Sequence, residues 1–115
     1  MIQTTSIEIP VTQLSKDDEL YKYSHPRLAQ LKLRKYLNDE NAVLYKSTNK
    51  NKKYMIITPD GHKVHFGQMN IGYEDFTKHG DEQRRQNYLK RTAGIKGDWK
   101  QNKFSANNLS RNVLW

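Results

Sequence analysis

The chain has 115 residues and a net charge of +8, and its hydrophobic residues make up only 35% of the total. This length suits one domain with a modest core, because globular domains usually contain about 45–50% apolar residues. Without cysteine the chain forms neither disulfides nor thiolate metal sites, which fits a reducing compartment. It contains no apolar run of the ~18 residues that a membrane span needs, and its first residues lack the features of a signal peptide.

The charge is unevenly distributed along the chain. Residues 1–20 contain one lysine and four acidic residues, for a net charge of −3. Residues 21–115 contain nineteen basic and eight acidic residues, for a net charge of +11. We therefore expect an N-terminal arm over residues 1–20 and one small domain over residues 21–115. A basic body attracts polyanions and an acidic arm attracts basic surfaces, although a large net charge also keeps a small protein soluble.

The N-terminal third predicts an extended segment followed by helices. Ile7, Ile9 and Val11 alternate around a central proline, as in an extended arm or an edge strand. Residues 15–23 favour one or two helical turns, with a serine cap and acidic residues in the first turn. Residues 24–39 predict the clearest helix, in which a proline takes the first helical position and an asparagine ends it.

The helix predicted over residues 24–39 has two apolar groups. One group shares a face and is expected in the core: Ala29, Leu33, Tyr36 and Leu37. The other group, Leu28 and Leu31, lies off this face among arginines and lysines. These two leucines belong either to a basic contact surface or to a second buried face, and the periodicity is compatible with both.

The middle of the chain predicts a three-stranded antiparallel meander. β-branched and aromatic residues are frequent in three short runs, at residues 41–47, 53–58 and 62–67. The sequence Pro-Asp-Gly at 59–61 predicts a tight turn between the last two runs, because proline presets φ and glycine accepts a positive φ. The loop between the first two runs is rich in lysine and asparagine.

The C-terminal third predicts two more helices. Residues 81–93 begin with acidic residues and are followed by a glycine, and residues 105–115 begin with a serine that can cap a short helix. The order of elements indicates an α+β fold: a small three-stranded antiparallel meander packed with two to four helices, with an extended N-terminal arm. Four large side chains are expected to pack the C-terminal segment onto the sheet: Trp99, Phe104, Leu109 and Trp115.

Residues 65–91 concentrate histidines, charged residues and aromatic residues, and three interpretations follow. The first is catalysis, for which Asp75, His79 and Asp81 offer titrating groups on one loop and the start of a helix. However, no metal-binding spacing, phosphate-binding loop or nucleophile motif accompanies them. We therefore expect no catalytic residues, no metal and no cofactor.

The second interpretation is contact with nucleic acid. Arg84, Tyr88 and Arg91 follow one another at i, i+4 and i+7, so a tyrosine that stacks on bases would lie between two phosphate-binding arginines. Three lysines of the basic loop would contact backbone phosphates: Lys50, Lys52 and Lys53. Because no known DNA-binding motif is present, such contact with double-stranded DNA would be charge-led and weakly sequence-specific. Solvated charges that merely coat a helix give the same pattern.

The third interpretation, which we favour, is that these residues chiefly stabilise the fold. Five polar residues would then have structural roles: His65, Asp75, His79, Asp81 and Arg85. The two aspartates would form ion pairs with an arginine or a lysine, and the histidines would hydrogen-bond a turn or a helix end.

An ordered series of motifs spans residues 45–115. It consists of Lys-Tyr at 53–54, a glycine at 61, Val-His-Phe-Gly at 64–67, Tyr-x-Asp-Phe at 73–76, His-x-Asp-x-x-Arg-Arg at 79–85 and Leu-Trp at 114–115. This series resembles a family of small uncharacterised proteins of large double-stranded DNA viruses and some phages. Residues 1–41 lie outside the resemblance.

The resemblance implies a viral, non-enzymatic protein. We expect a minor virion component, assembled in the host cytoplasm or another reducing compartment, that binds larger capsid or internal proteins. The expected contacts are the basic surface (Lys50, Lys52, Lys53, Arg84, Tyr88 and Arg91) and the arm (Ile7, Ile9 and Val11). The alternative is a basic nucleic-acid-associated protein that coats or condenses a viral genome.

Overall fold

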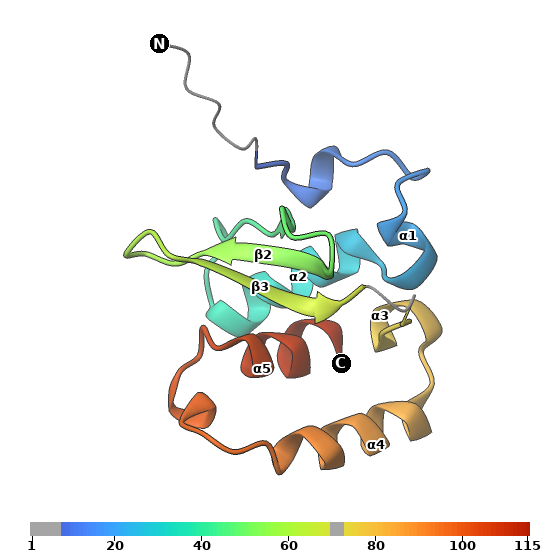
Figure 1. The fold of residues 1–115 in the computed structure, drawn as a ribbon. Coiled ribbons are helices and arrows are strands. Elements are labelled where there is room, and N and C mark those ends of the chain that lie inside the picture. Colours follow the sequence, from blue (N-terminus) through green and yellow to red (C-terminus); the bar gives the residue numbers. More distant parts are fainter. Residues whose placement is uncertain (1–7, 70–72) are drawn as a thin grey trace.

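The computed structural model describes residues 8–69 and 73–115 (Figure 1). Its sheet has the order β1-β2-β3 and consists of β1 (Tyr45–Lys46), β2 (Lys52–Ile57) and β3 (Lys63–Gln68), all antiparallel. The α-helices are α1 (Leu20–Tyr23), α2 (Pro26–Leu37), α3 (Phe76–His79), α4 (Glu82–Ala93) and α5 (Ala106–Leu109). Short helical turns complete the fold: η1 (Val11–Gln13), η2 (Trp99–Gln101) and η3 (Ser110–Leu114). The predicted α+β class and three-stranded antiparallel meander are confirmed.

The core forms where α2 and the C-terminal segment α5–η3 meet one face of the sheet. Tyr54, Ile56 and Phe66 contribute this face, and buried residues of α2 and of the C-terminal segment pack against them. In Figure 1, α5 lies between the sheet and α4. The guanidinium of Arg111 attaches α4 to this segment by donating hydrogen bonds to the Leu89 carbonyl at 2.7 Å and the Thr92 hydroxyl at 2.6 Å. The C-terminal segment thus connects α4 to the rest of the core.

The ends of the long helices follow the predicted chemistry. Pro26 takes the first position of α2, and Asn38 ends the helix in the left-handed conformation with φ +51°. The carboxylate of Asp81 accepts hydrogen bonds from the first backbone N–H groups of α4, and the Ser105 hydroxyl accepts one from α5. Within the described residues, no helix combines the length and apolarity that crossing a membrane requires.

Strand β1 is shorter than the predicted run of residues 41–47. Before Tyr45, the backbone of this run is bound by the side chain of Gln30, which is buried. Its amide donates a hydrogen bond to the Ala42 carbonyl at 2.9 Å, and its carbonyl oxygen accepts one from the Leu44 N–H at 2.8 Å. Helix α2 thus satisfies backbone groups on the edge of this run that faces away from β2, and the pairing with β2 begins at Tyr45.

Residues 8–20 pack into the domain, although the sequence predicted an arm up to residue 20. The Val11 N–H donates to the Leu44 carbonyl, and the Lys46 N–H donates to the Ile9 carbonyl, both at 2.9 Å. The segment thus pairs with the outer edge of β1, and its apolar side chains, including Val11 and Leu20, enter the core. The expected partner contact of Val11 is therefore wrong. Ile9 remains exposed, and Ile7 lies outside the described residues.

Gly67 in β3 combines a positive φ with a close approach of two side chains. Its φ is +83°, and an added Cβ would lie 2.8 Å from Cδ1 of Leu114 and 3.2 Å from Cβ of Lys53. Gly61, with φ +90°, has open space at the same position. Alanine at either site meets backbone strain of about 1–3 kcal/mol. Only Gly67→Ala adds an overpacking cost, which is typically about 1–3 kcal/mol.

We therefore expect Gly67→Ala to lower the free energy of unfolding by more than Gly61→Ala does. Urea unfolding followed by circular dichroism measures both losses under the same conditions. Equal losses in the two variants would show that Leu114 moves aside at no cost.

Candidate functional site

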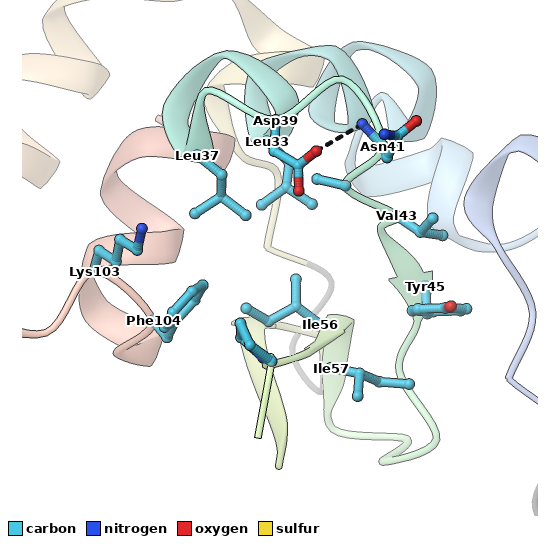
Figure 2. A pocket seen from close by; sticks show the side chains of 12 residues that line it. Leu33, Leu37, Asp39, Asn41, Val43, Tyr45, Ile56, Ile57, Lys103 and Phe104 are labelled. Atoms are coloured by element: carbon cyan, nitrogen blue, oxygen red, sulfur yellow. Dashed lines mark hydrogen bonds between the residues drawn. The ribbon is translucent and has the colours of Figure 1, made fainter. Parts of the chain in front are cut away.

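An apolar groove opens between α2, the sheet and the segment that follows η2 (Figure 2). Leu33 and Leu37 line it from α2, Ile56 lines it from β2, and Phe104 lines it from the opposite side. Leu33 and Ile56 also belong to the buried core, so the groove reaches down to the core itself. Its volume of about 360 Å³ is large enough for one or two apolar side chains of another molecule.

The rim of the groove carries exposed apolar side chains. Val43 and Ile57 are 37% and 41% exposed, and both line the groove. Tyr45 lies opposite Met55 in the pairing of β1 with β2. Val43 precedes β1, and Ile57 is the last residue of β2. The rim of the groove therefore comes from the segment before β1 and from the end of β2.

Two residues of opposite charge also line the groove, Asp39 just after α2 and Lys103 beside Phe104. The Tyr36 hydroxyl donates a hydrogen bond to the Lys103 carbonyl at 2.9 Å, which attaches this wall to α2. The lining offers hydrophobic contact and two opposite charges to a bound molecule. Such a site is suited to holding apolar side chains in a fixed orientation.

Lys53, predicted as a surface contact, is buried. Its ammonium lies 3.1 Å from Oδ2 of Asp75, and both side chains are only 1% exposed. The ammonium also donates to the backbone carbonyls of Tyr23, at 3.3 Å, and Tyr73. Burial lowers the pKa of Lys53, and the negative charge of Asp75 acts in the opposite direction. Because Lys53 is enclosed, its expected contact with a partner or with phosphate is wrong.

A chain of hydrogen bonds extends from this ion pair across the molecule. The Thr77 hydroxyl donates to Asp75 and accepts the His25 N–H at 2.9 Å. The Tyr54 hydroxyl donates to Ser24 at 2.6 Å, and Ser24 lies 3.1 Å from the Thr77 hydroxyl. The network joins β2, the start of α2 and α3, segments far apart in the sequence. All three N–H bonds of the Lys53 ammonium have an acceptor, so the pair is built as a structural link.

The other residues predicted to contact nucleic acid divide into two groups. Lys50 and Lys52 are exposed beside the turn between β1 and β2, and Arg84 and Arg91 are exposed on α4. Tyr88, in contrast, is half-buried and stacks on Trp115, with ring centroids 4.2 Å apart and an interplanar angle of 8°. Its ring is already stacked within the protein and is not presented to a base.

The polar residues expected to be structural lie at turns and helix ends. The His65 Nδ1 is 2.7 Å from the Ser47 hydroxyl. Asp81 caps α4 and forms no ion pair with an arginine among the described residues, contrary to expectation. Arg85 instead donates to the Trp115 backbone oxygen at 2.7 Å and pairs with Glu82 at 3.0 Å. The Asp81 carboxylate, predicted to form an ion pair, thus serves as the cap of α4.

His79 lies between α3 and α4, next to the rings of Phe76 and Trp115. Its Nδ1 accepts the Asp81 N–H at 2.9 Å, and its Nε2 is buried without a hydrogen-bond partner among the described residues. Burial, followed by the positive charge of Arg84, lowers the pKa of His79, while nearby carboxylates act in the opposite direction. The neutral imidazole is the form that this environment stabilises.

This environment predicts a pH dependence of stability. The pKa of His79 is lower in the folded state than the ordinary value of 6.5, so the unfolded state binds a proton first as the pH falls. The stabilisation by neutral His79 is then complete above about pH 6.5 and declines as the pH falls below that value. In urea unfolding between pH 7.5 and pH 5, the difference in free energy of unfolding between the native protein and His79→Gln should decrease as the pH falls. A difference that stays constant over this range would contradict the assignment.

The groove itself was not predicted from the sequence. Leu33, Leu37 and Phe104 were expected to be core residues, which is also how their residue types are normally used. The exposure of Val43 and Ile57 depends on how far the segment after η2 covers the sheet. Within residues 8–69 and 73–115, the structure brings no three histidine, aspartate or glutamate side chains together as a metal site.

Residues 42–92 of the chain match a family of unknown function, DUF5754. The matched stretch includes the whole sheet and most of α4. No curated protein and no solved structure matches the chain.

Proposed function

We propose that this chain is a non-enzymatic structural or adaptor protein of a viral particle, which holds a segment of a larger virion protein in its apolar groove. The observation that carries the proposal is the groove of about 360 Å³ with Val43 and Ile57 exposed at its rim. Exposed apolar side chains beside a groove that reaches the core are typical of a site that binds another molecule.

The partner segment has a defined chemistry. Its apolar side chains would contact Leu33, Leu37 and Phe104, the residues that line the groove. A basic residue of the segment would lie near Asp39, and an acidic residue near Lys103. The viral setting is supported by the sequence resemblance. The hydrogen bonds of the Lys53–Asp75 pair are all made within the protein, so these two residues serve the fold and are not available to a partner.

Co-sedimentation with purified particles tests this proposal. The double variant Val43→Asp/Ile57→Asp places two charges on the rim of the groove, at positions that are exposed in the free protein. We expect its affinity for particles to fall by roughly tenfold or more, because central apolar contacts of an interface often contribute about 2 kcal/mol. The matched control is Ile95→Asp, an exposed isoleucine that does not line the groove.

Circular dichroism and urea unfolding must first show that the variants fold like the native chain. Particle binding that is unchanged by Val43→Asp/Ile57→Asp would exclude the groove as the contact. Equal losses in the groove variant and in Ile95→Asp would indicate a general effect of added negative charge.

A second candidate function, association with a nucleic acid, is favoured by the exposed basic residues. Lys50, Lys52, Arg84 and Arg91 are all exposed, on two separate elements. If they contact phosphates, binding to random-sequence duplex DNA should weaken steeply as salt rises. Replacing Arg84 and Arg91 by glutamine should then reduce the slope of log K against log salt by about one for each arginine that binds a phosphate. Fluorescence anisotropy measures both effects, and absence of binding at low salt would exclude this function.

A further inference from the structure

Helix α2 has an outward face that is separate from the groove. Leu33 and Leu37 face the groove, whereas Leu28 and Leu31 project from the other side of the helix and are 39% and 60% exposed. Leu31 is the most exposed of the large apolar side chains in the part of the chain that the structure describes. The two leucines are three residues apart and therefore adjacent on the helix surface. The possibility of a second buried face on this helix is thus excluded.

Basic residues frame these leucines. From Pro26 to Leu37 the helix carries four arginines and lysines and no acidic residue. Arg27 and Lys35 lie four residues before and four residues after Leu31, so they continue the same stripe in both directions. Both are exposed, and neither forms an ion pair within the described residues.

The other two cations of α2 are used within the fold. The Arg34 side chain donates a hydrogen bond to the Ala42 carbonyl at 3.2 Å. The Lys32 ammonium lies 5.8 Å from the centre of the Phe76 ring, and burial lowers its pKa. Arg27 and Lys35 are therefore the cations of α2 that a second molecule can reach most readily.

We propose that the α2 outer face, defined by Arg27, Leu28, Leu31 and Lys35, binds an acidic amphipathic helix of a partner protein. Two apolar residues of that helix, three or four positions apart, would pack against Leu28 and Leu31. Acidic residues on either side of them would pair with Arg27 and Lys35. The positive charge of the face favours an acidic partner, because α2 contains no acidic residue that would repel one.

Other occupants fit this face less well. Duplex nucleic acid presents phosphates to the two cations, but its apolar groups lie on base edges inside the grooves and not between neighbouring phosphates, where the two leucines would lie. A membrane surface requires a larger apolar area than two leucines provide. A second copy of this chain offers two long helices, of which α2 has no acidic residue and α4 has one acidic and four basic residues, so neither is an acidic amphipathic helix.

A synthetic peptide tests the proposal directly. The probe is a fluorescein-labelled peptide of about 18 residues, with leucine at i, i+3 and i+7, glutamate beside the leucines and alanine at the remaining positions, a composition that favours a helix. A peptide of the same composition in scrambled order is its control. Anisotropy titration with the full chain should show binding of the amphipathic peptide at physiological salt. The scrambled peptide should bind roughly tenfold more weakly or worse, since each factor of ten is about 1.4 kcal/mol.

Variants assign the binding to the α2 outer face. Leu28→Gln/Leu31→Gln should weaken binding by roughly tenfold, because glutamine keeps the helix propensity and removes the apolar contact. Ile95→Gln, on an exposed isoleucine outside α2, is its control. Arg27→Glu/Lys35→Glu should have a comparable effect, whereas Arg84→Glu/Lys90→Glu, with the same change in net charge on α4, should not.

Three results would overturn the proposal. Equal binding of both peptides, or equal losses from charge reversal on α2 and on α4, would mean non-specific attraction. Binding to phosphatidylcholine/phosphatidylserine vesicles that depends on Leu28 and Leu31, without peptide binding, would assign the face to a membrane. Self-association in sedimentation experiments that Leu28→Gln/Leu31→Gln abolishes would assign it to a second copy.

Discussion

Asp75→Asn is expected to lower the free energy of unfolding by about 3–5 kcal/mol, the range measured when one partner of a buried ion pair is removed. Lys53 and Asp75 are both almost completely buried, so the substitution leaves an ammonium inside the protein without its counter-charge. Water cannot reach the ammonium to replace the missing interaction. Natural domains typically have a free energy of unfolding of about 5–15 kcal/mol, so this loss would remove a large part of the total stability. Urea unfolding followed by circular dichroism measures the loss.

Two further variants separate the ion pair from its surroundings. Asp60→Asn removes the partner of His62 in a pair whose side chains are 69% and 79% exposed, and it should change stability by less than about 1 kcal/mol. The double variant Lys53→Met/Asp75→Leu removes both buried charges and should recover much of the loss. If Asp75→Asn is as mild as Asp60→Asn, the pair does not act as a buried structural link.

Trp115→Ala is expected to lower the free energy of unfolding by a similar amount, about 3–5 kcal/mol. The indole is only 4% exposed and packs against three rings: Tyr73, His79 and Tyr88. Its removal leaves a cavity between the C-terminal segment and α4. Since the C-terminal segment lies between α4 and the sheet, hydrogen exchange in α4 should accelerate more than exchange in β2.

The control for this variant is Trp99→Ala. Trp99 is half-buried and its Nε1 donates to the Ile95 carbonyl at 2.7 Å. Deleting this side chain removes less buried surface and one hydrogen bond. A loss of stability in Trp99→Ala that equals the loss in Trp115→Ala would mean that the stacked cluster contributes little beyond an ordinary surface aromatic residue.

Local sequence features predicted most of the secondary structure. The Pro26 and Asn38 positions bounded α2, and Asp81 and Gly94 bounded α4, because capping and helix termination depend on residues next to one another in the chain. The turn at 59–61 placed β2 and β3 in register for the same reason. The prediction was wrong for the length of β1, which spans only Tyr45–Lys46 of the run predicted at 41–47.

The candidate sites depended more on contacts that are distant in sequence. In the sequence, Lys53 resembles the neighbouring lysines of its loop. In the structure it lies beside Asp75, far away in the sequence, and the two residues form a buried ion pair. The spacing of Tyr88 in the sequence predicted a base-stacking residue, but in the structure its ring stacks on Trp115. The groove forms from α2, β2 and the segment at Phe104, which no single stretch of sequence contains.

Charge counts, residue periodicity and turn chemistry were sufficient to predict the basic body, the long helices and the antiparallel pairing of β2 with β3. These signals act over a few residues, so they can be recognised in the chain alone. Which charged and apolar residues face the solvent followed from tertiary packing. Lys53 became buried while Leu28 and Leu31 stayed exposed, because burial depends on which distant segment packs against a residue and not on its residue type alone.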